Sequence, residues 1–164
     1  MKRHGLEIFI IIACVIVAFV WLLSSSKTTT ITELNESYHG SILKITATDL
    51  KALPNPDNAD EILVGIKFKY ENVSKNDSFL IWGSNIEGYI DDVAVGHWGE
   101  HYFNEPEVGL IGTKLSPGKQ TAGYYCLRAS KDAKNIEVRI TEKYNQKYVS
   151  FVFKIPELEE TYQQ

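Results

Sequence analysis

The chain has 164 residues, of which 44% are hydrophobic and 23% are charged, and this composition is ordinary for a protein with one globular domain. Its net charge at pH 7 is −4. No basic stripe runs along the sequence, so the charge argues against a protein that binds a nucleic-acid backbone. The two cysteines, Cys14 and Cys126, lie in an apolar run and in a strand-like segment. We therefore predict a domain without an internal disulfide.

The most hydrophobic segment covers residues 8–23, sixteen residues without a charged side chain. Lys2 and Arg3 precede it, and positive charges before an apolar segment keep that end of the chain in the cytoplasm. We predict that residues 1–23 are a signal anchor containing one transmembrane helix, which places the following domain on the extracytoplasmic side. A helix of sixteen residues spans about 24 Å, somewhat less than the roughly 30 Å hydrocarbon core of a bilayer.

Two other interpretations of this segment stay open. A cleaved signal peptide needs small residues before the cut, and Ser24 and Ser26 would supply them. A lipoprotein would use Cys14, but the apolar run continues for nine residues beyond that cysteine and would leave it in the middle of the membrane. We favour the uncleaved anchor. Residues 24–38 are rich in serine and threonine, and we predict that they form an extended spacer.

After the spacer, apolar residues alternate with polar ones, a pattern typical of half-buried antiparallel strands. The clearest case is residues 61–72 (EILVGIKFKYEN), and residues 148–155 (YVSFVFKI) repeat the pattern. Long amphipathic helical stretches are missing. The other predicted strands cover residues 42–50, 78–82, 86–90, 93–98, 121–128 and 135–141.

Turn sequences separate these segments, at residues 54–58, 74–77 and 116–119. Several short strands in this length predict an all-β fold, an immunoglobulin-like antiparallel β-sandwich over residues 39–156. The sequence lacks the Cys–Trp–Cys pattern of antibody domains. We expect the polar residues 157–164 to form a frayed tail.

Three stretches carry a resemblance to a known group of proteins: VGIKFKYENVSKN at residues 64–76, EGYIDD at residues 87–92, and LSPGKQTAG at residues 115–123. The chain resembles a family of Gram-positive surface proteins and lipoproteins of unknown function, whose domains are immunoglobulin-like, or telokin-like, sandwiches. In the third stretch, Pro117 and Gly118 match the family's L-x-P-G-K turn, in which proline fixes φ and glycine supplies a positive φ. The resemblance implies a sandwich fold but no established activity.

The strongest candidate for chemistry is His97-Trp98-Gly99-Glu100-His101, which fits the H-x-x-E-H pattern of one class of zinc peptidase. In that class a helix aims His97, Glu100 and His101 at the metal, yet Gly96 and Gly99 disfavour a helix. We predict a surface loop here and keep a metal site at these three residues as the alternative. For calcium, Asp91 and Asp92 are the acidic pair to test first.

Aromatic residues are concentrated in the middle of the domain. Trp98, Tyr102 and Phe103 lie in the loop from Val93 to Gly109, and exposed aromatic rings there would suit a protein or a glycan. Because alternation turns at least half of the aromatic residues of each strand inward, we favour core positions for these rings. Trp98, Tyr102 and Phe103 are the candidate ligand-binding residues of the alternative, a recognition patch in this loop. The Asn-x-Ser triplets at Asn35, Asn72 and Asn76 are interpreted as turns, and Cys126 as a buried strand residue.

Together these features predict a membrane-anchored, extracytoplasmic, non-enzymatic binding module that needs no cofactor. Its expected partners are the membrane, through residues 8–23, and a cell-envelope protein or glycan, but not nucleic acid. An exported domain without disulfides also favours a Gram-positive source. The alternative function is a metal sensor or metal-dependent enzyme that uses the loop with His97. A third is an accessory subunit of an envelope complex that makes contact through the helix.

Overall fold

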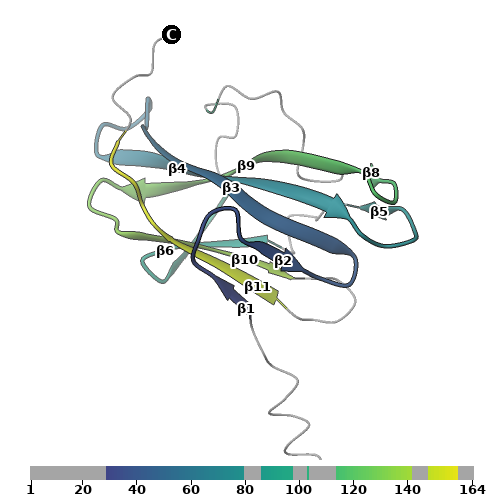
Figure 1. Ribbon diagram of the computed structural model, residues 1–164. Coiled ribbons are helices and arrows are strands. Elements are labelled where there is room, and N and C mark those ends of the chain that lie inside the picture. The colour runs from purple at the N-terminus through teal and green to yellow at the C-terminus, as the bar shows by residue number, and fades with distance from the viewer. Residues whose placement is uncertain (1–28, 80–85, 98–102, 104–113, 142–147, 159–164) are drawn as a thin grey trace, which may run out of the picture.

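The computed structural model describes residues 29–79, 86–97, 103, 114–141 and 148–158. These residues form eleven β-strands and no α-helix, and the strands build two facing sheets and a short two-stranded ribbon (Figure 1). The prediction of an all-β sandwich is therefore confirmed. No helix within the described ranges is long and apolar enough to cross a membrane, and the predicted anchor at residues 8–23 lies outside those ranges.

The first sheet has five strands in the order β1-β11-β10-β6-β7, and the second has four in the order β2-β3-β4-β9. All neighbours pair antiparallel except β1 and β11, which are parallel. The strands of the first sheet are β1 (Thr29–Ile31), β11 (Tyr148–Lys154), β10 (Asn135–Thr141), β6 (Ile86–Ile90) and β7 (Val93–Val95). Those of the second are β2 (Ser37–His39), β3 (Leu43–Pro54), β4 (Glu61–Asn72) and β9 (Gln120–Ser130), while β5 (Ser78–Phe79) and β8 (Lys114–Leu115) form the ribbon.

The main core lies between the two sheets and follows the alternation in β4. Ile62, Val64, Ile66, Phe68 and Tyr70 are all buried there. Phe68 meets Phe151 of the opposite sheet edge to face, with ring centroids 5.0 Å apart. Burying a side chain of this size contributes about 1.5–3 kcal/mol, so β4 supplies a large part of the stabilisation.

The other face of β4 departs from the half-buried strand that the alternation predicts. Leu63 is fully buried on this side, in a second apolar cluster with Leu53, Phe103, Tyr124 and Cys126. The burial of Cys126 confirms its prediction. Period-two alternation reports which residues share a face, but it does not report that another segment of chain covers the second face.

The sandwich also begins earlier than the predicted boundary at residue 39. Strand β1 and the first two residues of β2 lie inside the segment predicted as a spacer over residues 24–38, and Ile31 is part of the main core. Strand β1 is held by backbone pairing with β11. Such pairing uses backbone groups and needs no apolar side chains. A strand in this segment, which is rich in serine and threonine, could therefore not be predicted from the pattern of apolar residues. Of the predicted tail, residues 157 and 158 are described and have no regular structure.

The predicted turn at residues 116–119 is confirmed. Lys119 donates its backbone N–H to the carbonyl of Ser116 at 3.0 Å, and Gly118 has a φ of 70°, which costs glycine little. Backbone bonds then join this turn to the end of β4, from Gly118 to the carbonyl of Asn72 at 2.8 Å and from Asn72 to the carbonyl of Lys119 at 3.0 Å. Two of the three stretches behind the family resemblance are thus in direct contact.

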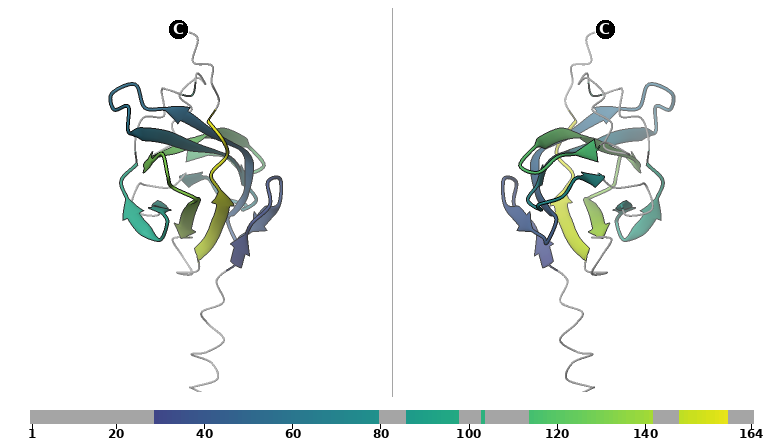
Figure 2. Two further views of the ribbon diagram at one scale, coloured as in Figure 1. Left: turned by 90° about the vertical axis from the view of Figure 1, so that its left-hand side faces the viewer. Right: turned by 90° about the vertical axis from the view of Figure 1, so that its right-hand side faces the viewer.

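The strand directions give the sandwich two distinct ends, which Figure 2 shows from two further sides. At the entry end lie the start of β1, the end of β4 and the turn at residues 116–119. At the far end lie the start of β4, the loop at residues 131–134 and the segment 155–158 that follows β11. Because β1 runs parallel to β11, the chain enters the sandwich at one end and leaves it at the other.

Candidate ligand site

His97 is the one residue of the predicted metal site that the described ranges contain. It follows β7 and forms an isolated bridge with Leu127 of β9, and its ring lies 4.9 Å from that of Tyr125. It borders an open groove of about 330 Å³ together with Glu87, Tyr89 and Tyr125. Burial, together with the negative charge of Glu87, raises the pKa of Tyr125 to about 12.

Glu100 and His101 lie outside the described residues. Within the described ranges, no three histidine, cysteine or acidic side chains gather closely enough to hold a metal ion. A metal site at His97, Glu100 and His101 therefore stays a prediction.

Phe103 is buried, as the favoured core position of these aromatic residues predicts, and it does not supply the exposed ring that the recognition patch needs. Its ring stacks on Tyr124 with centroids 4.9 Å apart. It also covers Gly65, where an added Cβ would lie 2.7 Å from the ring. A glycine in the middle of a strand leaves a gap on the sheet, and the aromatic ring fills it. Trp98 and Tyr102 lie outside the described residues, so their role in ligand binding stays a prediction.

Asp91 and Asp92 form the two-residue turn between β6 and β7, with φ values of 44° and 67°. Aspartate tolerates this left-handed region better than most residues do. The carboxylate of Asp91 accepts backbone N–H groups of Lys134, at 3.1 and 3.2 Å, and of Asn135, at 2.9 Å. The structure therefore gives Asp91 a positioning role toward the neighbouring loop.

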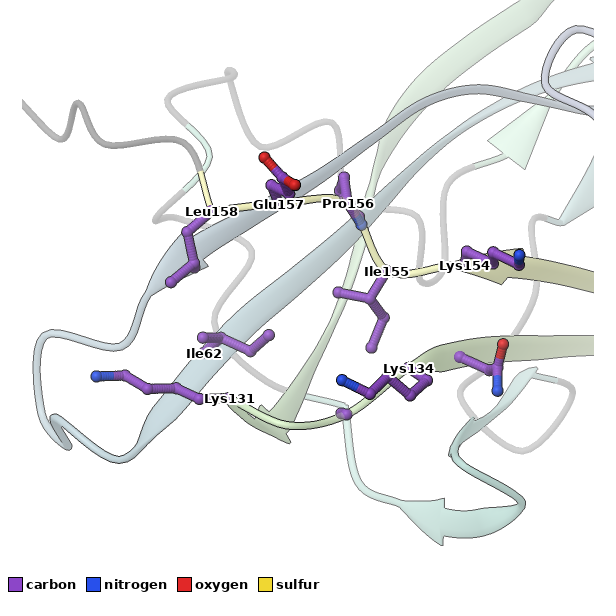
Figure 3. A pocket seen from close by; sticks show the side chains of 10 residues that line it. Ile62, Lys131, Lys134, Lys154, Ile155, Pro156, Glu157 and Leu158 are labelled. Carbon is purple, nitrogen blue, oxygen red and sulfur yellow. The ribbon is translucent and has the colours of Figure 1, made fainter.

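That loop borders a pocket at the far end of the sandwich (Figure 3). The pocket has a volume of about 670 Å³ and lies between the start of β4, the loop at residues 131–135 and the segment 154–158. Figure 3 shows Ile62, Ile155 and Leu158 beside the opening, with Lys131 and Lys134 along the loop. We call it the far-end pocket, lined by Ile62, Lys131, Ala133, Lys134, Asn135, Lys154, Ile155, Pro156, Glu157 and Leu158.

The walls of the far-end pocket are fixed by backbone hydrogen bonds. Lys131 donates to the carbonyl of Asp60 at 3.4 Å, and Ala133 donates to Ser130 at 3.0 Å. Ile155 donates its backbone N–H to the carbonyl of Lys134 at 2.8 Å, and this bond holds the segment that follows β11 against the loop. With the bonds from Asp91, these contacts indicate a pocket that is formed before any ligand arrives.

The charge of the far-end pocket is opposite to that of the whole chain. Its lining carries three lysines and one acidic residue, Glu157, whereas the chain has a net charge of −4. Lys131, Lys134 and Lys154 are exposed, and no ion pair involves them in the described part of the chain.

Sequence reasoning missed this pocket. Lys131 and Lys134 are separated from Lys154 by about twenty residues, and the pairing of Asn135 with Lys154 brings them to one place. The sequence signal that was present is the polar stretch Lys131-Asp132-Ala133-Lys134 between two predicted strands. It reads as an ordinary exposed turn.

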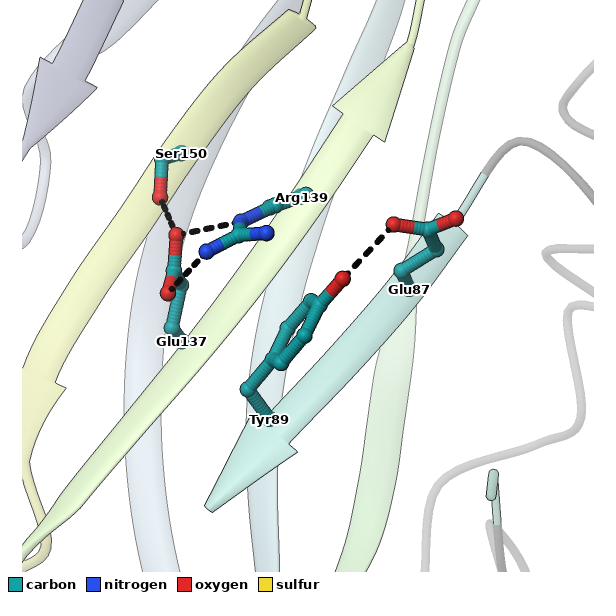
Figure 4. Close-up of polar contacts among 5 residues, drawn as sticks. All are labelled: Glu87, Tyr89, Glu137, Arg139 and Ser150. Atoms are coloured by element: carbon teal, nitrogen blue, oxygen red, sulfur yellow. Dashed lines mark hydrogen bonds and ion pairs between the residues drawn. The ribbon is translucent and has the colours of Figure 1, made fainter. Parts of the chain in front are cut away.

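A second polar group lies on the outer face of the first sheet, where the side chains already satisfy one another (Figure 4). Arg139 donates to both carboxylate oxygens of Glu137, at 2.7 and 3.0 Å, and Ser150 donates a further bond to the same carboxylate. The guanidinium also lies 4.0 Å from the centre of the Tyr89 ring. The hydrogen bonds from Arg139 hold the pKa of Glu137 below its ordinary value. This group stabilises the sheet and leaves little capacity for a ligand.

No family model matches the chain, and no curated protein sequence matches it. Solved structures do. An uncharacterised β-sandwich protein from Clostridium difficile is similar with a TM-score of 0.50 and 12% identity, covering 80% of this chain and 96% of its own. The yjhA protein from Bacillus subtilis gives a TM-score of 0.51 at 12% identity, covering 77% of this chain and 100% of its own. A functionally unknown protein from Listeria monocytogenes gives 0.53 at 16% identity, covering 80% and 84%.

These likenesses define the class of the protein as a β-sandwich. These three structural neighbours come from Gram-positive bacteria, and two of them are described as uncharacterised or functionally unknown. Identities of 12–16% establish the shared fold and carry no ligand or activity to this chain.

Proposed function

We propose that the protein is a non-enzymatic binding module on the outer face of a Gram-positive cell membrane, tethered by residues 8–23 and binding its ligand at the far end of the sandwich. The domain would be an immunoglobulin-like or telokin-like surface domain. The observation that carries the proposal is the position of the far-end pocket, at the opposite end of the sandwich from the start of β1.

The strand register gives the distance between the start of β1 and the far-end pocket. Thr29, the first residue of β1, pairs with Val149, and β11 then continues to Lys154 at the pocket. At about 3.3 Å per residue, Lys154 lies roughly 17 Å further along the strand. An anchor that precedes Thr29 would therefore hold the far-end pocket away from the bilayer and open to the envelope.

The orientation of the domain is tested by labelling intact cells with a membrane-impermeant thiol reagent. Lys75 is exposed, and the Lys75→Cys variant in a background of Cys14→Ala and Cys126→Ser carries one reactive thiol. We expect this thiol to be labelled without lysis and the protein to remain in the membrane fraction. Labelling only after lysis would contradict an extracytoplasmic domain, and release of the protein from the membrane would contradict tethering.

The use of the far end is tested by photo-crosslinking in the same intact cells. A photoreactive residue replaces Lys134 at the far end in one variant, and Lys119 at the entry end in the matched control. Both lysines are exposed. We expect a crosslinked product from position 134 only. Equal products from both positions, or products from position 119 alone, would place the binding surface elsewhere.

A further inference from the structure

We propose that the far-end pocket binds a small amphiphilic anion, that is, a carboxylate or phosphate group joined to an apolar chain. This inference rests on the proposed function, because it names the class of ligand that the far end of a binding module would hold. Three features of the pocket carry it: an apolar floor, a cationic rim and walls that are already in place.

The apolar floor is the open end of the main core. Ile62 belongs to the buried core cluster, and Ala133 and Ile155 pack against that cluster. Leu158 is a large apolar side chain that remains 39% exposed. An apolar chain placed against Ile62, Ile155 and Leu158 would extend the core and remove this surface from water, which is favourable in proportion to the area covered.

The cationic rim selects the sign of the ligand. Lys131 and Lys134 come from the loop, and Lys154 comes from the end of β11. Three ammonium groups less the one carboxylate of Glu157 leave a lining charge of +2. Flexible lysine side chains act as point charges for anionic groups, and an ammonium head on the ligand would be repelled.

The fixed walls reduce the cost of binding. The loop is bonded to Asp60, Ser130 and Asp91, and Ile155 is bonded to Lys134, so little main-chain freedom is lost when a ligand binds. The volume of about 670 Å³ falls within the range of roughly 300–1,000 Å³ that is typical of small-molecule sites.

Binding is tested by calorimetry on the full-length protein in lipid nanodiscs, with hexanoate and hexyl phosphate as probes. Inorganic phosphate tests the head group alone, and hexyltrimethylammonium tests the same chain with the opposite charge. The pocket variant is Lys131→Gln, Lys134→Gln and Lys154→Gln together. The matched control has the same change of charge in exposed lysines away from the pocket: Lys69→Gln, Lys75→Gln and Lys119→Gln.

We expect hexanoate and hexyl phosphate to bind the native protein and the control variant with the same affinity. The pocket variant should bind both anions at least about tenfold more weakly. A difference between hexanoate and hexyl phosphate would identify the preferred head group. A midpoint of thermal unfolding in both variants equal to that of the native protein would show that the fold is intact.

Four results would overturn the inference: no binding of either anion, equal loss in the control variant, equal binding of inorganic phosphate and hexyl phosphate, or binding of hexyltrimethylammonium to the native protein as tight as that of hexyl phosphate. If neither anion binds while crosslinking still occurs at position 134, the inference is wrong and the proposed function stands.

Discussion

Asn72 joins three segments at the entry end with its side chain alone. The amide donates to the carbonyls of Asn76 and Leu115, both at 2.8 Å, and its oxygen accepts the backbone N–H and the hydroxyl of Ser74 at 2.9 and 2.8 Å. The residue is fully buried. Its interpretation as a turn residue rather than a glycan acceptor is consistent with this geometry, because a glycan on Nδ2 would replace one of the two N–H donors at a fully buried position.

We expect Asn72→Ala to lower the free energy of unfolding by about 3 kcal/mol, because several buried polar groups lose their partners. Chemical denaturation of the native protein and the variant gives the value. Asn76→Ala is the matched control, since the side chain of Asn76 is exposed and should change stability little. Equal losses in the two variants would contradict the role assigned to the Asn72 amide.

The contact between Gly65 and Phe103 can also be tested by single substitutions. A methyl group at Gly65 would collide with the Phe103 ring at 2.7 Å, so we expect Gly65→Ala to destabilise the protein by roughly 1–3 kcal/mol. The same substitution should cost much less in a Phe103→Ala background, where the ring is absent. A double-mutant cycle measures this coupling, and additive losses would show that the ring does not lie on Gly65.

At the scale of elements, the turn between β6 and β7 holds the loop that borders the far-end pocket. Asp91→Asn keeps a residue that tolerates a positive φ but removes the charge that accepts the N–H groups of Lys134 and Asn135. We expect this variant to lose about 1 kcal/mol and to show faster hydrogen exchange at those two amides. Asp92→Asn, in the same turn, is the control and should leave both amides protected. Unchanged exchange in Asp91→Asn would show that the loop is held by its other bonds.

At the level of the whole molecule, Tyr125 makes the stability of the folded sandwich sensitive to high pH. Its ring lies in the main core, and burial raises its pKa from the ordinary 10 to about 12. The neutral phenol is therefore favoured in the folded state, and its contribution to stability is complete below pH 10 and is lost as the pH rises toward 12. Denaturation at several pH values should show this decline, and Tyr125→Phe should remove most of it. An identical decline in Tyr125→Phe would assign the effect to another group.

Features that depend on neighbouring residues could be predicted from the amino-acid sequence. Alternation in β4 identified the face with Ile66 and Phe68 that meets the opposite sheet, because successive side chains of a strand point to opposite faces. Pro117 and Gly118 identified their turn, because each has restricted or special backbone angles. These local preferences also predicted the all-β class, which the fold confirms.

Other features depend on contacts between segments that are distant in the sequence, and local patterns do not predict them. Phe103 is buried because its ring packs on Gly65 and Tyr124. Strand β1 forms because its backbone pairs with the edge strand β11. The far-end pocket requires Asn135 and Lys154 to pair, so that lysines about twenty residues apart border one apolar floor. No local pattern encodes such a meeting, because the register of two strands is set by the packing of the whole sheet.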